Sequence, residues 1–165
     1  LALPDGKLLG GSTTDPGTGG ERKAAQAELY IMDIPTKGIE WHSAVLPGVS
    51  GYTNLCLGRK GRVYGMADAS RFFVFDPLQG VVVHEEDTEA RFGLIGYQQG
   101  HRKFVTAPDG TLYILFQKGV VRVDQDSFGL TLIAESPVPL TFGGDMLDGR
   151  IYFGSGSHLY SVKVP

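Results

Sequence analysis

Residues 109–124, DGTLYILFQKGVVRVD, carry the pattern that decides the fold of this 165-residue chain. The Asp-Gly pair predicts a tight turn, the apolar run Leu112–Phe116 predicts a strand, and the Lys-Gly pair after it predicts a reversal into a second strand. The pattern recurs after Gly6, Gly61 and Gly149, so the turn glycines are spaced at intervals of about 40 to 55 residues. We therefore expect four copies of one antiparallel unit.

The composition favours many short strands over helices. Glycine accounts for 24 of the 165 residues and supplies turns, while the plentiful Val, Tyr and Phe favour strands. The net charge is −3 without a dense Lys and Arg cluster, so a nucleic-acid partner is not expected. No apolar run approaches the length of a membrane span, and the lone Cys56 excludes an internal disulfide. A protein with one cysteine suits the cytosol or a secreted bacterial protein, and we slightly favour an extracytoplasmic (secreted or periplasmic) location.

A period near forty residues with about four strands per unit is typical of a β-propeller, in which each unit forms one antiparallel blade. We therefore predict an all-β protein, a β-propeller of about four blades, with repeat units at about 1–48, 49–94, 95–138 and 139–165. The innermost strands are expected at 52–57, 103–107 and 140–146, and the outermost strands at 39–46, 81–85 and 130–135. Residues 13–26 are extra in the first unit, and their Pro and Gly content predicts an inserted loop.

The predicted ring does not close within these residues. The first unit has only a stub of an innermost strand, Leu1–Leu3, and the fourth has no outermost strand before Pro165. An open half-ring would expose two apolar blade faces, which soluble monomers seldom tolerate. Because the chain begins Leu-Ala-Leu-Pro rather than with Met, we expect a segment of a larger, bacterial, seven- or eight-bladed propeller. The remaining blades are expected from the parent chain or from a second copy.

Two units continue beyond their third strand with a similar motif. Residues 29–41 are LYIMDIPTKGIEW and residues 73–83 are FVFDPLQGVVV, while residues 154–160, GSGSHLY, resemble the hairpin of the same repeat. The first stretch resembles the quinoprotein-like (PQQ-type) repeat, in which an Asp and a Thr-x-Gly turn lead into a strand ending in a Trp that docks against the next blade. Kelch-like and other propeller families share much of this pattern. The resemblance implies blades, and it carries over neither a bound quinone nor a dehydrogenase activity.

The residues of this motif have physical roles of their own. The carboxylates of Asp33 and Asp76 are expected to accept backbone N–H groups of the following turn, and Gly38 and Gly80 to supply a positive φ. Trp41 is expected to pack between blades rather than to stack on a ligand, because large aromatic side chains dominate core burial.

Candidate binding residues are expected in loops, because loops on a rigid scaffold carry function. The longest connection, residues 86–102, combines hydrogen-bond donors with an aromatic ring, a mixture suited to an oxygen-rich ligand such as a sugar or a carboxylate. The alternative is a solvated loop packed by Phe92, Leu94 and Ile95. The candidate ligand-binding residues are Tyr52, Arg71, Tyr97, Gln98, His101, Arg102 and His158.

Catalytic and metal signals are weak in this sequence. The four histidines lack ligand spacing, so no metal and no other cofactor is expected, and no Gly-x-Ser-x-Gly elbow identifies a nucleophile. Catalytic residues therefore stay unknown. The leading hypothesis is a non-catalytic propeller scaffold or recognition module that binds a protein or a glycan. Two alternatives remain open: an enzyme acting on a sugar or uronic acid at the propeller axis through Tyr52, Arg71, His101, Arg102 and His158, and a purely structural self-assembly module.

Overall fold

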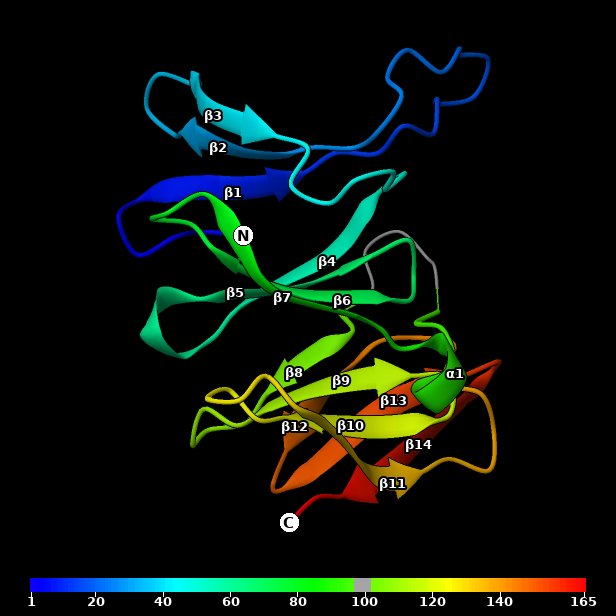
Figure 1. Cartoon of the computed structure of the whole chain (residues 1–165). Coiled ribbons are helices and arrows are strands. Elements are labelled where there is room, and N and C mark those ends of the chain that lie inside the picture. The colour runs from blue at the N-terminus through cyan, green and yellow to red at the C-terminus, as the bar shows by residue number, and fades with distance from the viewer. Residues whose placement is uncertain (97–101) are drawn as a thin grey trace. The chain divides into compact units, whose positions relative to one another are not determined.

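The computed structural model describes residues 1–96 and 102–165 (Figure 1). Their strands form four antiparallel sheets, of which two have four strands and two have three. The predicted all-β class is confirmed. The chain divides into two compact units, Leu1–Glu86 (unit 1) and Asp87–Pro165 (unit 2), and each is considered separately. Within the described residues, no helix has the length and apolar character needed to cross a membrane.

Unit 1 contains two sheets in which each strand pairs with the next one in sequence (Figure 1). The first sheet has the order β1-β2-β3 and the second β4-β5-β6-β7, with a short 3-10 turn, Arg59–Gly61, between β4 and β5. The strands are β1 Lys7–Gly11, β2 Leu29–Asp33, β3 Ile39–Ser43, β4 Tyr52–Leu57, β5 Val63–Ala67, β6 Arg71–Asp76 and β7 Val81–Asp87.

Unit 2 repeats this arrangement after a short helix, α1 Glu89–Phe92. Its sheets have the orders β8-β9-β10-β11 and β12-β13-β14. The strands are β8 Phe104–Thr106, β9 Leu112–Phe116, β10 Gly119–Val123, β11 Leu130–Glu135, β12 Gly144–Leu147, β13 Arg150–Ser155 and β14 His158–Lys163. The innermost strand of the last sheet therefore starts four residues later than position 140, the start predicted from the sequence. The sequence analysis did not foresee α1.

Each unit has its own hydrophobic core formed by side chains of both its sheets. In unit 1 the core includes Leu9 and Ile31 from the first sheet and Val63, Phe73 and Phe75 from the second. In unit 2 the corresponding residues are Val105, Leu115 and Val120 from β8–β10 and Ile151 and Phe153 from β13. Burial of apolar surface between paired sheets is the main stabilising contribution, at roughly 25 cal/mol per Å².

The turns that follow β2, β6 and β10 share one geometry. Asp33 Oδ1 accepts the Thr36 N–H at 2.9 Å, and Asp76 Oδ1 accepts the Leu78 N–H at 2.9 Å, as predicted. Asp124 Oδ1 accepts the Asp126 N–H at 2.9 Å in the same way. The Thr36 hydroxyl, which donates to Asp33 Oδ1 at 2.5 Å, and the Thr36 N–H hold the pKa of Asp33 below its usual range. The Asp126 N–H and the donors of Ser127 do the same for the pKa of Asp124.

The left-handed residue of each turn lies four positions after its Asp. That position is Gly80 in the second sheet, with φ 69°, as predicted, but it is Lys37 in the first sheet, with φ 58°, and Phe128 in the third, with φ 64°. The prediction of a positive φ at Gly38 is therefore wrong, because that glycine lies five positions after Asp33. The turn geometry, rather than the position of the glycine, sets the backbone conformation.

The inserted residues between β1 and β2 form a loop without strand or helix apart from an isolated bridge at Thr13. Its two ends are tied to the connection between β3 and β4: the Thr14 N–H donates to Ser50 O at 2.7 Å, and the Ala27 N–H donates to Val49 O at 2.7 Å. Residues 15–25 between these ties are all exposed. The loop is thus anchored at its base and solvated at its tip.

Candidate functional site

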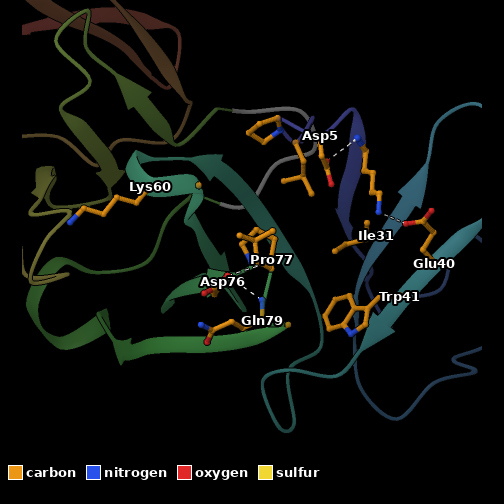
Figure 2. Close-up of a pocket in the computed structure, with 14 residues that line it drawn as sticks. Asp5, Ile31, Glu40, Trp41, Lys60, Asp76, Pro77 and Gln79 are labelled. Atoms are coloured by element: carbon orange, nitrogen blue, oxygen red, sulfur yellow. Dashed lines mark hydrogen bonds and ion pairs between the residues drawn. The ribbon is translucent and has the colours of Figure 1, made fainter.

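A groove of about 530 Å³ lies between the two sheets of unit 1, at the end where the turns gather (Figure 2). Strand β3 forms one side of it. The opposite side is the turn between β6 and β7, residues 76–80, and the remaining wall comes from the turns at residues 3–5 and 60–61. This volume falls within the range of ordinary ligand pockets, which is about 300 to 1,000 Å³.

The floor of the groove is part of the hydrophobic core. Leu3, Ile31 and Trp41 line the groove and also belong to the core of unit 1 or pack against it. The Trp41 ring contacts Phe75 of the second sheet, with the ring centroids 5.5 Å apart. A Cβ at position 80 would lie 3.5 Å from Trp41 Nε1, an ordinary van der Waals distance, so the indole lies directly beside this turn. The prediction that Trp41 packs between sheets is confirmed, and the same residue forms part of the floor of the groove.

Charged side chains at the groove are bonded to one another or to the backbone. Lys7 Nζ lies 2.6 Å from Glu40 Oε2, and this carboxylate raises the pKa of Lys7. Asp76 pairs with Arg62 through Oδ2 and accepts the turn N–H groups of Leu78 and Gln79 through Oδ1. In Figure 2 the ammonium end of Lys60 points away from Trp41.

The lip of the groove is apolar and open to solvent. Leu78 is 93% exposed although it lines the groove, and Pro4 and Pro77 flank it. A leucine with so much of its side chain in water has few packing contacts within the chain. It therefore contributes apolar surface to whatever enters the groove.

Two of the predicted site residues, Tyr52 and Arg71, hold the connection between β3 and β4. The Leu46 N–H donates to the Tyr52 hydroxyl at 3.3 Å, and burial raises the pKa of this tyrosine. Arg71 Nη1 donates to Pro47 O at 2.9 Å, and its Nε donates to Glu85 at 2.8 Å. Both side chains thus have structural contacts, and a ligand-binding role for them stays a prediction.

The other predicted residues belong to unit 2. Arg102 Nη1 lies 3.5 Å from Asp145 Oδ2, and both side chains are mostly exposed. His158 lies at the start of β14, with its Nδ1 3.4 Å from Ser157 Oγ. Three further predicted residues, Tyr97, Gln98 and His101, lie outside the described residues.

Lys103 is a buried cation in unit 2 that the sequence analysis did not single out. Its side chain is 0% exposed, and Nζ donates to Thr141 O at 3.0 Å. Burial disfavours the charged form and lowers the pKa of Lys103 to about 8. The backbone of Gly96 approaches both groups so closely that a Cβ there would lie 3.1 Å from Lys103 Nζ.

The part of the chain that the structure describes contains no group of three or more His, Cys, Asp and Glu side chains that could hold a metal ion.

Comparison with known structures identifies the architecture. The β-propeller domain of Cps50 (Swd1) from Myceliophteria thermophila aligns with 93% of this chain at 16% identity and a TM-score of 0.60, and the alignment covers 46% of that domain. A protein provisionally assigned as a gluconolactonase gives a TM-score of 0.56 at 15% identity over 99% of this chain and 56% of its own. A fungal alcohol oxidase of the AA5 family, solved with copper, gives 0.55 at 14% identity over 93% of this chain and 36% of its own.

These similarities establish the fold class and nothing finer. The four antiparallel sheets are blades of a β-propeller, as predicted, and the chain spans about half the length of the first two structures that it matches. Neither the family models nor the curated protein sequences include a match to this chain. The structures that resemble it include a β-propeller domain, a provisionally assigned gluconolactonase and an alcohol oxidase.

Proposed function

We propose that this chain is a non-catalytic recognition module that binds a protein or a glycan in the groove of unit 1. One observation carries the proposal: the core residues Leu3, Ile31 and Trp41 form the floor of an open groove whose lip, Leu78, is 93% exposed. Apolar surface that remains accessible beside the core of a folded domain is typical of an interaction site.

The test uses the only tryptophan of the chain as the reporter. Trp41 lines the groove, so a ligand that enters it will change the wavelength or the intensity of the tryptophan emission. The full chain is screened against a glycan array and against a displayed library of random peptides, and each hit is then titrated while the emission is recorded. We expect at least one class of ligand to change the emission saturably. If no glycan and no peptide changes the Trp41 emission, the proposal is contradicted.

A second candidate function, catalysis on a sugar or uronic acid, is supported by Lys103. A buried amine with a pKa of about 8 can act as a proton acceptor near neutral pH, and one structure of similar fold is provisionally assigned as a gluconolactonase. The chain is assayed for hydrolysis of gluconolactone together with Lys103→Met and, as a matched lysine control, Lys118→Met. Turnover that only Lys103→Met abolishes would favour the enzyme over the recognition module.

We further propose that additional blades complete the propeller, supplied by the rest of a parent chain or by a second copy. The proposal is supported by the share of each similar structure that the chain covers, between 36% and 56%. Light scattering over a range of concentrations separates the two sources. A dimer that dissociates on dilution supports a second copy, whereas a monomer at every concentration contradicts it.

A further inference from the structure

Four of the charged side chains around the groove of unit 1 already have partners. Asp76 accepts N–H groups from Leu78 and Gln79 and pairs with Arg62, while Glu40 is bound by Lys7. The Asp5 carboxylate accepts the Lys7 N–H at 3.2 Å. A sugar has many hydroxyl groups, and each of them needs a partner when it is removed from water. The Gln79 amide also lines the groove and can bond to a ligand, but one such side chain does not supply a partner for each hydroxyl group of a sugar.

The floor of the groove offers a different interaction. Leu3 and Ile31 are 8% and 9% exposed, so they present a thin apolar surface that is continuous with the core. An apolar side chain placed on them beside Trp41 would extend the core without any requirement for new hydrogen bonds. The volume of about 530 Å³ gives room for more than one such side chain.

The charges of the groove also select against a charged ligand group. Counted with Arg62, the side chains that line the groove carry three positive and three negative charges, Lys7, Lys60 and Arg62 against Asp5, Glu40 and Asp76, so they leave no net charge. A charged side chain that entered would lose its hydration, and a groove without net charge would offer it little in return. An uncharged apolar group bears no such cost.

We propose that the groove binds an extended, uncharged peptide segment of a partner protein, which inserts a large apolar side chain against Trp41, Ile31 and Leu3 under the lip formed by Leu78. This inference rests on the proposed recognition function and names its ligand. Leu78 would cover the inserted side chain, because it is exposed and lies in the turn that faces β3 across the groove. Pro4 and Pro77 would contact the flanking peptide backbone.

The experiment begins with selection from a displayed library of random peptides of about twelve residues on the immobilised full chain. The enriched peptide is synthesised, along with one version in which its shared apolar residue is alanine and one in which that residue is lysine. Binding is measured by titration with Trp41 emission as the signal. We expect saturable binding with a blue shift for the selected peptide, and at least about a tenfold rise in Kd for each altered version.

Matched variants of the protein locate the bound peptide. Leu78→Ser removes the apolar lip, and because Leu78 is 93% exposed the fold is expected to remain intact. Leu159→Ser is the control, since this leucine of β14 in unit 2 is 75% exposed. Leu78→Ser is expected to raise Kd at least about tenfold, and Leu159→Ser to leave it within about twofold. If Leu78→Ser and Leu159→Ser bind the selected peptide with equal Kd, the peptide does not bind in the groove and the proposal is wrong.

Neutral oligosaccharides separate this inference from the proposed function. Cellohexaose and chitohexaose are titrated with the same readout. If they change the Trp41 emission and no selected peptide does, the peptide inference is wrong while the recognition function stands. If neither sugars nor peptides change the emission, both fail.

Discussion

The two units join their sheets with different chemistry. In unit 1 the ring of Trp41 spans from β3 to Phe75 and leaves a groove of about 530 Å³ beside it. In unit 2 the corresponding groove is about 220 Å³, and it is lined by the Phe153 and Tyr160 rings together with Val120, Ala134 and Val162. Trp41 thus contacts a ring of the neighbouring sheet, whereas Phe153 and Tyr160 stack within one sheet, beside the smaller Val120 and Ala134 of the other.

The innermost strands show a second difference. In unit 2 the Gly144 N–H donates to Arg102 O at 3.1 Å, and the buried Lys103 donates to Thr141 O, so polar groups link β8 to the segment that leads into β12. In unit 1 the Tyr52 N–H donates to Ser12 O at 3.1 Å, and the Tyr52 ring contacts Phe73 of its own sheet, with the ring centroids 5.5 Å apart. Both units thus have a backbone hydrogen bond near their innermost strands, and they differ in the side chain beside it: an aromatic tyrosine in unit 1 and a buried lysine in unit 2. The four predictions that follow test this contrast.

The largest expected effect is the loss of the contact between Trp41 and Phe75. Phe75→Ala removes a fully buried ring and is expected to cost about 3 to 5 kcal/mol of unfolding free energy, measured by urea denaturation. The Trp41 emission of the folded variant should move to longer wavelength, because its packing partner is gone. Phe153→Ala, in unit 2, is the matched control: it should destabilise the chain while leaving the emission of folded Trp41 in place. A red shift of the Trp41 emission in both variants would show that the emission does not report on the contact between Trp41 and Phe75.

The next effect concerns the buried Lys103 of unit 2. The pKa of Lys103 is about 8 in the folded chain and 10.5 ordinarily, so the unfolded chain binds more protons between these values and stability rises with pH there. Below pH 8 the buried, charged Lys103 lowers the unfolding free energy by its full amount, which is on the order of 3 kcal/mol. Lys103→Met should raise the unfolding free energy at pH 7 by about 1 to 3 kcal/mol and remove the rise between pH 8 and 9.5.

The urea series of wild type and Lys103→Met is run at pH 7, 8 and 9.5, with Lys118→Met as the control. Lys118 donates to Ala90 O from an exposed position, so its replacement should leave the pH dependence unchanged. An equal pH slope in wild type and Lys103→Met would show that the burial of Lys103 does not limit stability.

A smaller effect is expected in the turns. Gly80→Ala places a side chain at φ 69° and should cost about 1 kcal/mol, whereas Lys37→Gly relieves φ 58° and should be neutral or stabilising by up to about 1 kcal/mol. The Tm of Gly80→Ala should therefore fall, whereas the Tm of Lys37→Gly should stay level or rise. Destabilisation by Lys37→Gly would show that the lysine side chain, rather than the backbone, matters at this position.

The smallest effect comes from the turn carboxylates. The pKa values of Asp33 and Asp124 are lowered by turn hydrogen bonds, so their contribution is present at neutral pH and is lost as the pH falls through the lowered pKa. Asp33→Asn and Asp124→Asn should each lower Tm slightly at pH 7. The difference from wild type should shrink below pH 4, and a difference that persists in acid would indicate a packing effect instead.

The sequence predicted the strands well because they are local. Each sheet pairs neighbouring segments across short turns, so alternation and turn residues within about forty residues suffice to place them, as at β4 and β11. The turn at Gly38 was misplaced because a positive φ depends on the distance from Asp33, and a lysine can occupy that position.

The groove could not be foreseen in the same way. Its walls come from turns near residues 4, 60 and 77, which are brought together only when two blades pack. The one usable signal was Leu78, an apolar residue in a turn expected to be solvated. Lys103 was missed since a lysine at the start of a strand usually lies at the surface, and its burial is a property of the packed unit.

The anchored insertion of unit 1 offers a practical attachment point. Because its base is fixed to residues 49 and 50 while positions 15–25 are exposed, a fluorophore, an affinity tag or a whole guest domain placed at Gly17 should be carried without disturbing the strands. Protease cleavage at the same tip would leave both halves held together by the ties at the base. Unit 1 could then be immobilised in a chosen orientation.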